Sequence, residues 1–353
     1  MIDRKSYEPM YQQIKRDIEQ QILSGQIQIG DKLMSETQML EHYHVARMTV
    51  RAALAELVSS GCLAKEQGRG TFCVALPRQA KSSVDVLLDA GDSYFAPYFL
   101  SGVSRVLERE GYPLVLNDTR DSLALSERLL QQILSRGTSG IILQPYRGVE
   151  EVPDGLLREL TRCQAAGIPL VTIDGTFRSL DFPGCMTDDV AGGRLATEHL
   201  LAMGHRKILG LFRSRYRDSV FRTRGYCQAM QAHCLTPQIL DADGDYQPAL
   251  QALLQSGQIT AIVCYNDLLA VDCFHLFAQS GVRVPKDISV VGYDDTALAA
   301  ASLPQLTSVT HPKDLMGEDA ANCLLQMIRG GQALPRQRMY QPELRPRQSV
   351  RQL

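Results

Sequence analysis

The chain has 353 residues, of which 44% are hydrophobic and 22% charged, and its formal net charge is −2. These fractions are typical of a globular protein with two or three domains. No run of about 18 apolar residues is present, which argues against a membrane-spanning helix. The near-neutral charge argues against a protein that coats nucleic acid without selection. Nine scattered cysteines and an N-terminus without an apolar signal core predict reduced thiols, a cytoplasmic location and no metal site.

The first 45 residues contain signals for two helices. Apolar residues recur at helical spacing between Tyr11 and Ile22 and stop at Ser24-Gly25, which predicts a first helix. Ser35 followed by Gln38 is a capping-box pattern, and it predicts the start of a second helix.

A third helix is predicted over residues 45–58. Arg47, Thr49 and Arg51 lie near its start and outside its apolar stripe, so they are free to contact phosphates and base edges. The alternative is an ordinary amphipathic helix with a solvated basic edge. The stripe itself would face a core and consists of Val50, Ala53, Leu54, Leu57 and Val58.

Two short extended segments follow, Leu63–Gln67 and Thr71–Val74, joined by Gly68-Arg69-Gly70. This pattern predicts a two-stranded wing with a basic, glycine-rich tip. Basic residues outnumber acidic ones from Arg47 to Lys81. Three helices and a wing predict a small α+β winged helix-turn-helix domain that binds DNA.

This first part resembles the GntR family of regulators, through "SETQMLEHYHVARMTVRAALAELVSSG" and "GRGTF". Three departures stand out: Met34 replaces a usual proline, Thr37 replaces a common DNA-contacting arginine, and Ala46 replaces a hydroxyl residue that would cap the third helix. Alanine there forfeits about 1 kcal/mol. The resemblance implies DNA contacts from Ser35, Glu36, Arg47, Thr49, Arg51, Gly68, Arg69, Gly70 and Thr71.

We divide the chain into a DNA-binding domain at residues 1–76, a polar, proline-broken linker at 77–83, and an effector domain at 84–353. In the last part, short apolar runs alternate with helical segments, which predicts doubly wound parallel sheets. The length favours two α/β lobes. The arginines between residues 336 and 351 are expected to be solvated. The predicted strands are Val84–Leu88, Leu114–Leu116, Gly140–Leu143, Leu170–Ile173, Ile208–Phe212, Ala261–Cys264 and Ser289–Gly292.

Polar residues follow several of these strands, where ligands of such sheets bind. Asp174, Asn266 and Asp294 could bind hydroxyl groups, and an aromatic side chain could stack on the apolar face of a sugar. Asp and Asn at strand ends are also common helix N-caps, so this alternative stays open.

From Val84 to Arg347 the chain resembles the effector domain of LacI-type repressors, through "TDDVAGGRLATEHLLAMGHRKI", "FRTRGY" and "LPQLTSVTHP". A GntR head on such a body is the architecture of AraR-type arabinose repressors, which implies a pentose effector and a homodimer. The resemblance also implies a return to the first lobe over Leu306–Pro312. It implies effector contacts from Tyr94 or Phe95, Asp174, Arg222, Asn266 and Asp294.

We therefore expect a DNA-binding transcription repressor whose operator affinity is controlled by a small carbohydrate. One alternative is a sugar sensor that activates transcription. A carbohydrate-acting enzyme is disfavoured because no nucleophile elbow, phosphate loop or dinucleotide fingerprint is present. A transport binding protein is disfavoured by the DNA-binding head. We expect no cofactor.

Overall fold

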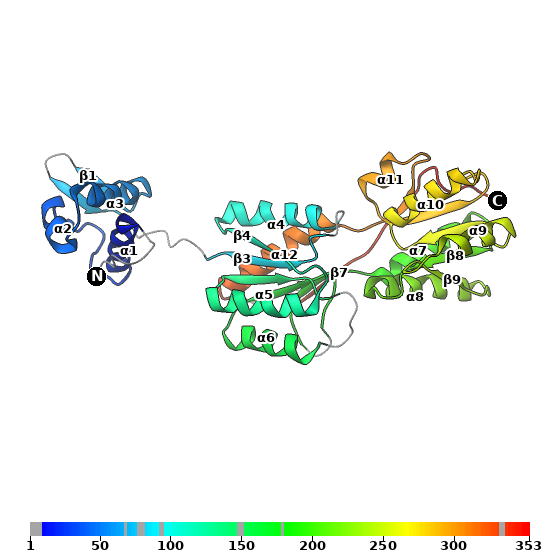
Figure 1. Cartoon of the computed structure of the whole chain (residues 1–353), viewed down its shortest axis with the longest axis horizontal. Coiled ribbons are helices and arrows are strands. Elements are labelled where there is room, and N and C mark those ends of the chain that lie inside the picture. Colours follow the sequence, from blue (N-terminus) through cyan, green and yellow to red (C-terminus); the bar gives the residue numbers. More distant parts are fainter. Residues whose placement is uncertain are drawn as a thin grey trace. The chain divides into compact units, whose positions relative to one another are not determined.

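The computed structural model describes residues 9–66, 69–75, 82–91, 95–146, 152–177, 180–331 and 336–353. The chain forms two compact units, Met1–Ala80 and Lys81–Leu353 (Figure 1). None of the helices in the described ranges is long and apolar enough to cross a membrane.

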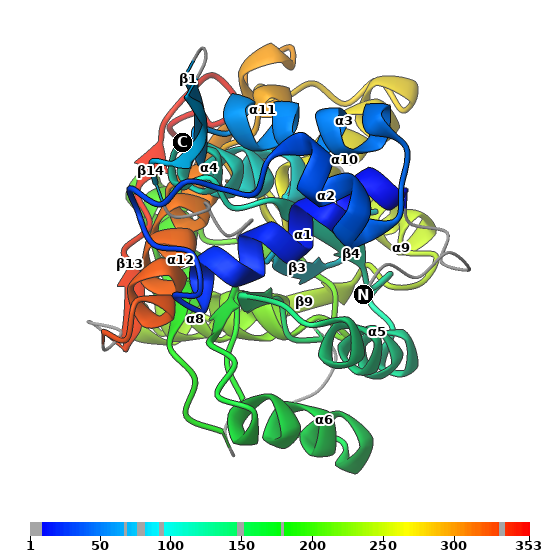
Figure 2. The same ribbon diagram turned by 90° about the vertical axis from the view of Figure 1, so that its left-hand side faces the viewer.

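The first unit is a three-helix bundle with a two-stranded wing, as predicted. Figure 2 shows its helices together at the front. The apolar faces of α1 and α3 meet in one core around Ile14, Ile18, Val50 and Leu57. The strands of the wing pair antiparallel, with Leu63 opposite Cys73. The elements are α1 (Met10–Leu23), α2 (Glu36–Tyr43), α3 (Arg47–Ser59), β1 (Leu63–Glu66) and β2 (Gly70–Cys73).

The second unit contains two six-stranded sheets; the first has one core cluster on each face, and the second has one large cluster between its strands and helices. The first sheet has the order β13-β7-β6-β5-β3-β4 and is parallel throughout. Its strands are β3 (Val84–Leu88), β4 (Leu114–Asp118), β5 (Gly140–Leu143), β6 (Leu170–Ile173), β7 (Gly184–Thr187) and β13 (Gln337–Tyr340).

The second sheet has the order β14-β12-β11-β10-β8-β9, and only the pairing of β12 with the edge strand β14 is antiparallel. Its three central strands are fully buried because helices cover both faces. The strands are β8 (Ile208–Phe212), β9 (Gln238–Asp241), β10 (Ala261–Cys264), β11 (Ser289–Asp294), β12 (Thr307–Thr310) and β14 (Leu344–Arg345).

Helices flank both sheets. In the first lobe, α4 and α12 lie on one face and α5 and α6 on the other (Figure 1). In the second lobe, α7 packs against α8. The helices are α4 (Ala96–Glu110), α5 (Leu123–Arg136), α6 (Asp154–Ala165), α7 (Asp189–Ala202), α8 (Arg217–Ala232), α9 (Gln247–Gln255), α10 (Asp267–Gln279), α11 (Ala297–Ala301) and α12 (Lys313–Ile328).

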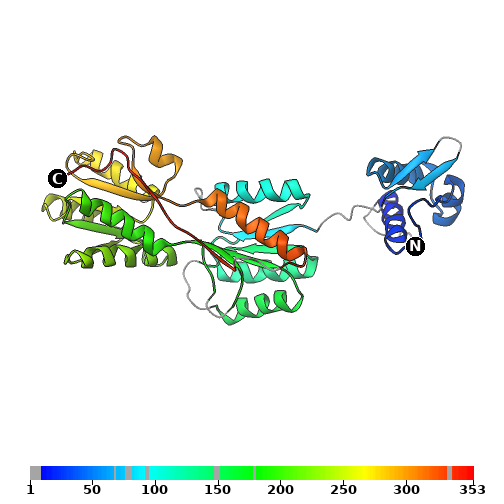
Figure 3. The same ribbon diagram turned by 180° about the vertical axis from the view of Figure 1, so that it is seen from behind.

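The chain passes between the lobes three times: after β7, after β12, and between β13 and β14. Figure 3 shows the last passage in red. Two expectations were wrong here. Residues 307–310 form strand β12 of the second sheet, so the chain returns to the first lobe only after them. Arg347 is not simply solvated, because its Nη1 donates to the carbonyl of Leu306 at 2.8 Å and its Nη2 bonds Asp295.

Candidate DNA interface and effector site

Helix α3 begins without a side-chain cap. Ala46 occupies the N-cap position with extended backbone angles, and its side chain makes no capping hydrogen bond. Arg47 and Arg51 are exposed, whereas Thr49 is half-buried. The predicted loss of capping at Ala46 is confirmed, and the exposed arginines lie one turn apart at the positive end of the helix.

Glu36, the first residue of α2, is an ion-pair partner of α3 and of the wing. Its carboxylate oxygens lie 2.9 Å from Nε of Arg51 and 3.2 Å from Nζ of Lys65. These hydrogen bonds lower the pKa of Glu36. Ser35 forms the predicted capping box with Gln38, whose Oε1 accepts from the Ser35 amide at 2.8 Å. Glu36 thus orients the guanidinium of Arg51, and the Ser35 side chain caps the start of α2.

The described part of the wing tip presents a backbone bend and one arginine. Gly70 has φ +125°, and a Cβ there would lie 2.7 Å from Cε of Lys32. Arg69 pairs with Glu66 at 2.6 Å and lies 5.7 Å above the Phe72 ring.

Thr71 contributes its carbonyl, which accepts from the Leu33 amide at 2.9 Å. Gly68, the remaining wing residue of the predicted interface, lies outside the described residues.

In the second unit, Arg222 is the centre of a buried polar cluster. Its Nε donates to Asp189 at 2.9 Å, and its Nη2 lies 3.5 Å from Asp218 and 3.7 Å from Asp294. Its Nη1 donates to the Tyr265 carbonyl at 2.8 Å. The guanidinium is only 1% exposed. Two helices, α7 and α8, and strand β11 therefore each deliver one carboxylate to the same buried cation.

The acidic groups of the cluster respond differently to burial. Burial raises the pKa of Asp189 against the opposing effect of Arg222. Burial alone would also raise the pKa of Asp294, but the cations of Lys313 and Arg222 outweigh it and hold that pKa well below its ordinary value. Burial raises the pKa of the neighbouring Asp267 to about 7. Asp294 is therefore a permanent anion of the site.

His311 connects the end of the first sheet to the end of the second. Its Nδ1 lies 3.1 Å from Oδ1 of Asp294, which ends β11, and its Nε2 lies 3.6 Å from Oδ1 of Asp174, which follows β6. Lys313, at the start of α12, donates to the Asp294 carbonyl at 2.9 Å. Asp174 and Asp294 have φ of +52° and +99°, so both carboxylates leave a strained turn.

Several buried polar atoms around Arg222 have no hydrogen-bond partner within the described residues. Such atoms cost free energy unless a ligand or water pairs with them. The cluster offers acceptors and donors together, which suits the hydroxyl groups of a sugar. The atoms are Oδ1 of Asp218, Oδ2 of Asp294, the Tyr293 hydroxyl and Nε2 of His311.

The three remaining predicted effector contacts are Phe95, Asn266 and Tyr94, and their outcomes differ. Phe95 is buried, stacks on Phe99 at 5.5 Å and lies 5.6 Å from the His311 ring, so it borders the cluster. Asn266 caps α10 through its Oδ1, which accepts from the Leu269 amide at 3.0 Å. This hydrogen bond is the helix N-cap role that the sequence left open as an alternative to a sugar contact. Tyr94 lies outside the described residues.

Sequence reasoning missed four residues of the cluster: Asp189, Asp218, His311 and Lys313. Sequence signals were present for two of these residues, Asp218 and Asp189. Asp218 precedes Arg222 by one helical turn, and both aspartates of Thr187-Asp188-Asp189 stand at a helix start. His311 and Lys313 follow a strand that was not predicted, and although His311 lies in the quoted stretch LPQLTSVTHP, no side-chain role was assigned to it there.

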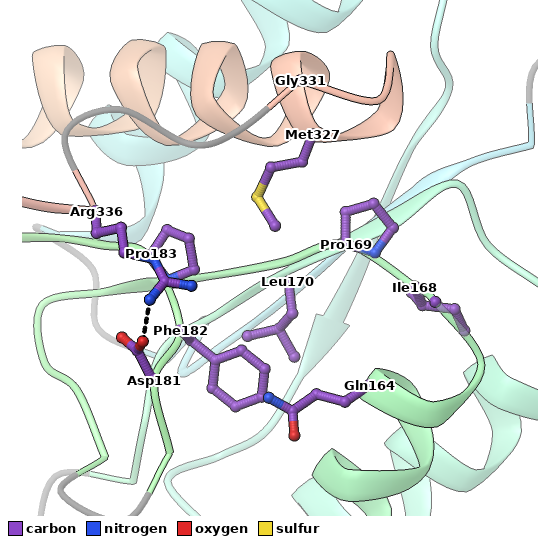
Figure 4. Close-up of a pocket in the computed structure, with 11 residues that line it drawn as sticks. Gln164, Ile168, Pro169, Leu170, Asp181, Phe182, Pro183, Met327, Gly331 and Arg336 are labelled. Carbon is purple, nitrogen blue, oxygen red and sulfur yellow. Dashed lines mark hydrogen bonds and ion pairs between the residues drawn. The ribbon is translucent and has the colours of Figure 1, made fainter.

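Two cavities flank the first lobe. One of about 370 Å³ adjoins the cluster and includes Asp294 and His311 in its lining. The other, of about 730 Å³, lies at the amino ends of β6 and β7 (Figure 4). Two charged residues of its lining, Arg336 and Asp181, form an ion pair with each other (Figure 4). Of the residues whose polar atoms lack partners around Arg222, Asp294 and His311 line the first cavity and none lines the second.

Two family models match separate parts of the chain. Residues 10–73 match the gntR family of bacterial regulatory proteins, and residues 197–350 match the periplasmic binding protein-like domain. The chain is 32% identical to the arabinose metabolism transcriptional repressor of Geobacillus stearothermophilus, over 98% of each chain.

Two solved structures show the same fold. The transcriptional regulator CelR in complex with cellobiose is 25% identical, with a TM-score of 0.65, over 86% of this chain and 91% of its own. A LacI transcriptional regulator from Alkaliphilus metalliredigens, complexed with D-xylulofuranose, is 21% identical, with a TM-score of 0.66, over 76% and 99%. By its full-length identity, the chain belongs to the family of transcriptional regulators that contains the arabinose metabolism repressors.

Proposed function

We propose that this regulator is a cytoplasmic, homodimeric repressor that a pentose, with L-arabinose as first candidate, releases from its operator. The observation that carries the effector site is the set of four buried polar atoms without partners around Arg222. A sugar with several adjacent hydroxyl groups would pair with them and remove their desolvation cost. The relative at 32% identity is named for arabinose metabolism, which favours a pentose.

The proposed effector contacts are Arg222, Asp294 and Asp174, with His311 between the two carboxylates. Because Asp174 follows a strand of the first sheet and Asp294 ends a strand of the second, one ligand that bonds both would favour one arrangement of the lobes. A ligand shifts such an equilibrium by its differential affinity for the two arrangements.

The proposed DNA contacts are Arg47, Thr49 and Arg51 on α3, with Arg69, Gly70 and Thr71 at the wing. Helix α3 would enter the major groove, with its exposed N-terminal arginines toward base edges and phosphates. Glu36 would hold Arg51 in direction rather than read a base itself, because its carboxylate already has two cationic partners. Two heads of a homodimer would read a pseudo-palindromic operator.

The test uses the full chain with L-arabinose, D-xylose, D-ribose and D-glucose. One pentose is expected to raise the thermal midpoint, since a ligand at 100 times its Kd adds about 2.7 kcal/mol. The same pentose should lower the affinity for an operator obtained by in vitro selection. Light scattering should report a dimer.

Two variants separate the two sites. Asp294→Asn should abolish the sugar response and keep operator binding, whereas Arg47→Ala should weaken operator binding and keep the sugar response. The proposed effector class is wrong if none of the four sugars changes either the thermal midpoint or operator affinity.

A further inference from the structure

The exposed face of α3 is apolar along its centre line. Met48 is the most exposed of its residues with a large apolar side chain, at 74%. Ala52 and Ala55 continue the line from Met48 toward the end of the helix, and both are exposed. At 3.6 residues per turn this line lies opposite the buried stripe. The buried stripe is Val50, Ala53, Leu54 and Leu57.

Charged groups border this line and leave its centre free. Arg47 and Arg51 lie along one side of it. On the other side, Glu56 is neutralised by Lys15, whose Nζ lies 2.8 Å from its carboxylate. A solvent-facing helix surface normally carries long polar side chains, so methionine and two alanines beside two arginines form an unusual surface.

We propose that the line Met48, Ala52 and Ala55 reads thymine methyl groups in the operator, with Met48 as the main specificity-determining residue. This rests on the proposed DNA-binding role of α3. The C5-methyl of thymine is the apolar group that the major groove presents, and apolar side chains recognise it. The small alanines let the helix approach the base edges, and the flexible thioether of Met48 adapts its contact to the methyl position.

The charges favour duplex DNA as the occupant of this face. Arg47 and Arg51 are exposed beside Met48 and complement phosphates and guanine edges. The apolar line of α3 and its two arginines therefore complement the major groove, which presents thymine methyl groups between two negatively charged phosphate backbones.

The test uses the full chain and an operator selected from random duplex DNA, in which each thymine is replaced in turn by uracil. This change removes one methyl and no hydrogen-bonding group. For wild type, at least one replacement should weaken binding about fourfold, the value of one buried methyl. Met48→Gln, of similar length but polar, should bind the thymine and uracil forms of that position equally.

Two controls separate this inference from the proposed function. Met10→Gln makes the same change at a methionine that is 43% exposed at the start of α1, and it should keep the methyl effect. Arg47→Ala should weaken binding to both forms alike. The inference is wrong if Met48→Gln keeps the wild-type methyl effect or if no uracil matters. Failure of wild type to select any operator would overturn the DNA-binding role and this inference with it.

Discussion

Asp189 on α7 accepts a 2.9 Å hydrogen bond from Arg222 on α8, at a point where the two helix backbones touch. Glycines make this contact possible. A Cβ on Gly193 would lie 2.0 Å from the Arg222 carbonyl oxygen, and one on Gly225 would lie 2.0 Å from the Val190 carbonyl oxygen. The close helix pair therefore holds the Arg222 backbone, and with it the buried guanidinium, in place for its three carboxylates.

Gly193→Ala should destabilise the second unit and abolish the sugar response. The added methyl collides with backbone, which cannot move as a side-chain end could, and overpacking of this kind costs roughly 1–3 kcal/mol. Circular dichroism melting and a sugar titration measure both effects. Gly244→Ala is the matched control, since a Cβ there has no atom within 4 Å. Equal behaviour of the two variants would show that the helix contact does not position Arg222.

Ala46→Ser should stabilise the head. The N-cap backbone angles at Ala46, φ −73° and ψ 152°, already suit a capping residue, and the Thr49 amide lies close enough to bond its carbonyl at 3.0 Å. A serine hydroxyl would accept from the first turn and add about 1 kcal/mol. Ala46→Val, which cannot accept a hydrogen bond, should give no gain. A melting transition of the head that responds equally to both changes would contradict this account.

The winged-helix domain could be predicted from the sequence because the residue patterns that specify its elements are local. The capping box at Ser35, the apolar stripe of α3 and the glycine-rich wing tip each lie within one short segment. The parallel sheets were also predictable in type, since their central strands are continuous apolar runs. Edge strands such as β9, with alternating burial, carried no such signal.

The polar cluster proposed as the effector site could be predicted only in part, because it is assembled from distant segments. Arg222 and Asp294 were expected from the resemblance, and they lie 3.7 Å apart. His311 was missed because it follows β12, a polar strand whose threonines and serine do not resemble a buried run. The Asn266 side-chain oxygen caps the start of α10, as the N-cap alternative predicts, and its role as an effector contact stays a prediction.

Arg222→Lys should leave the regulator on its operator in the presence of sugar. One ammonium cannot replace a guanidinium that bonds Asp189, the Tyr265 carbonyl and Asp294 in different directions. Losing part of a buried ion network costs on the order of 3–5 kcal/mol. Anisotropy of labelled operator with increasing pentose measures the response. Arg224→Lys, an exposed arginine of the same helix, is the control and should behave as wild type. A normal sugar response in Arg222→Lys would remove Arg222 from the site.

Protonation of the buried His205 ring should lower the stability of the second unit in mild acid. The imidazole is fully buried, with Nε2 at 3.1 Å from the Arg351 carbonyl and Nδ1 at 2.9 Å from the Thr260 hydroxyl. Nε2 must donate to the carbonyl, so in the neutral ring Nδ1 accepts from the hydroxyl. Burial lowers the pKa of His205 and outweighs the hydrogen bond to the Arg351 carbonyl, which raises it.

Because the folded pKa of His205 is below the unfolded value, the unfolded chain binds the proton more readily. The stability that the neutral ring contributes is therefore complete above about pH 6.5 and is lost as pH falls through the lower folded value. His205→Gln removes this titration. Urea unfolding, followed by circular dichroism because the chain has no tryptophan, should show a larger loss of midpoint from pH 7 to pH 5 in wild type than in His205→Gln. If the urea midpoints of wild type and His205→Gln fall equally from pH 7 to pH 5, protonation of His205 does not contribute to the acid sensitivity of the second unit.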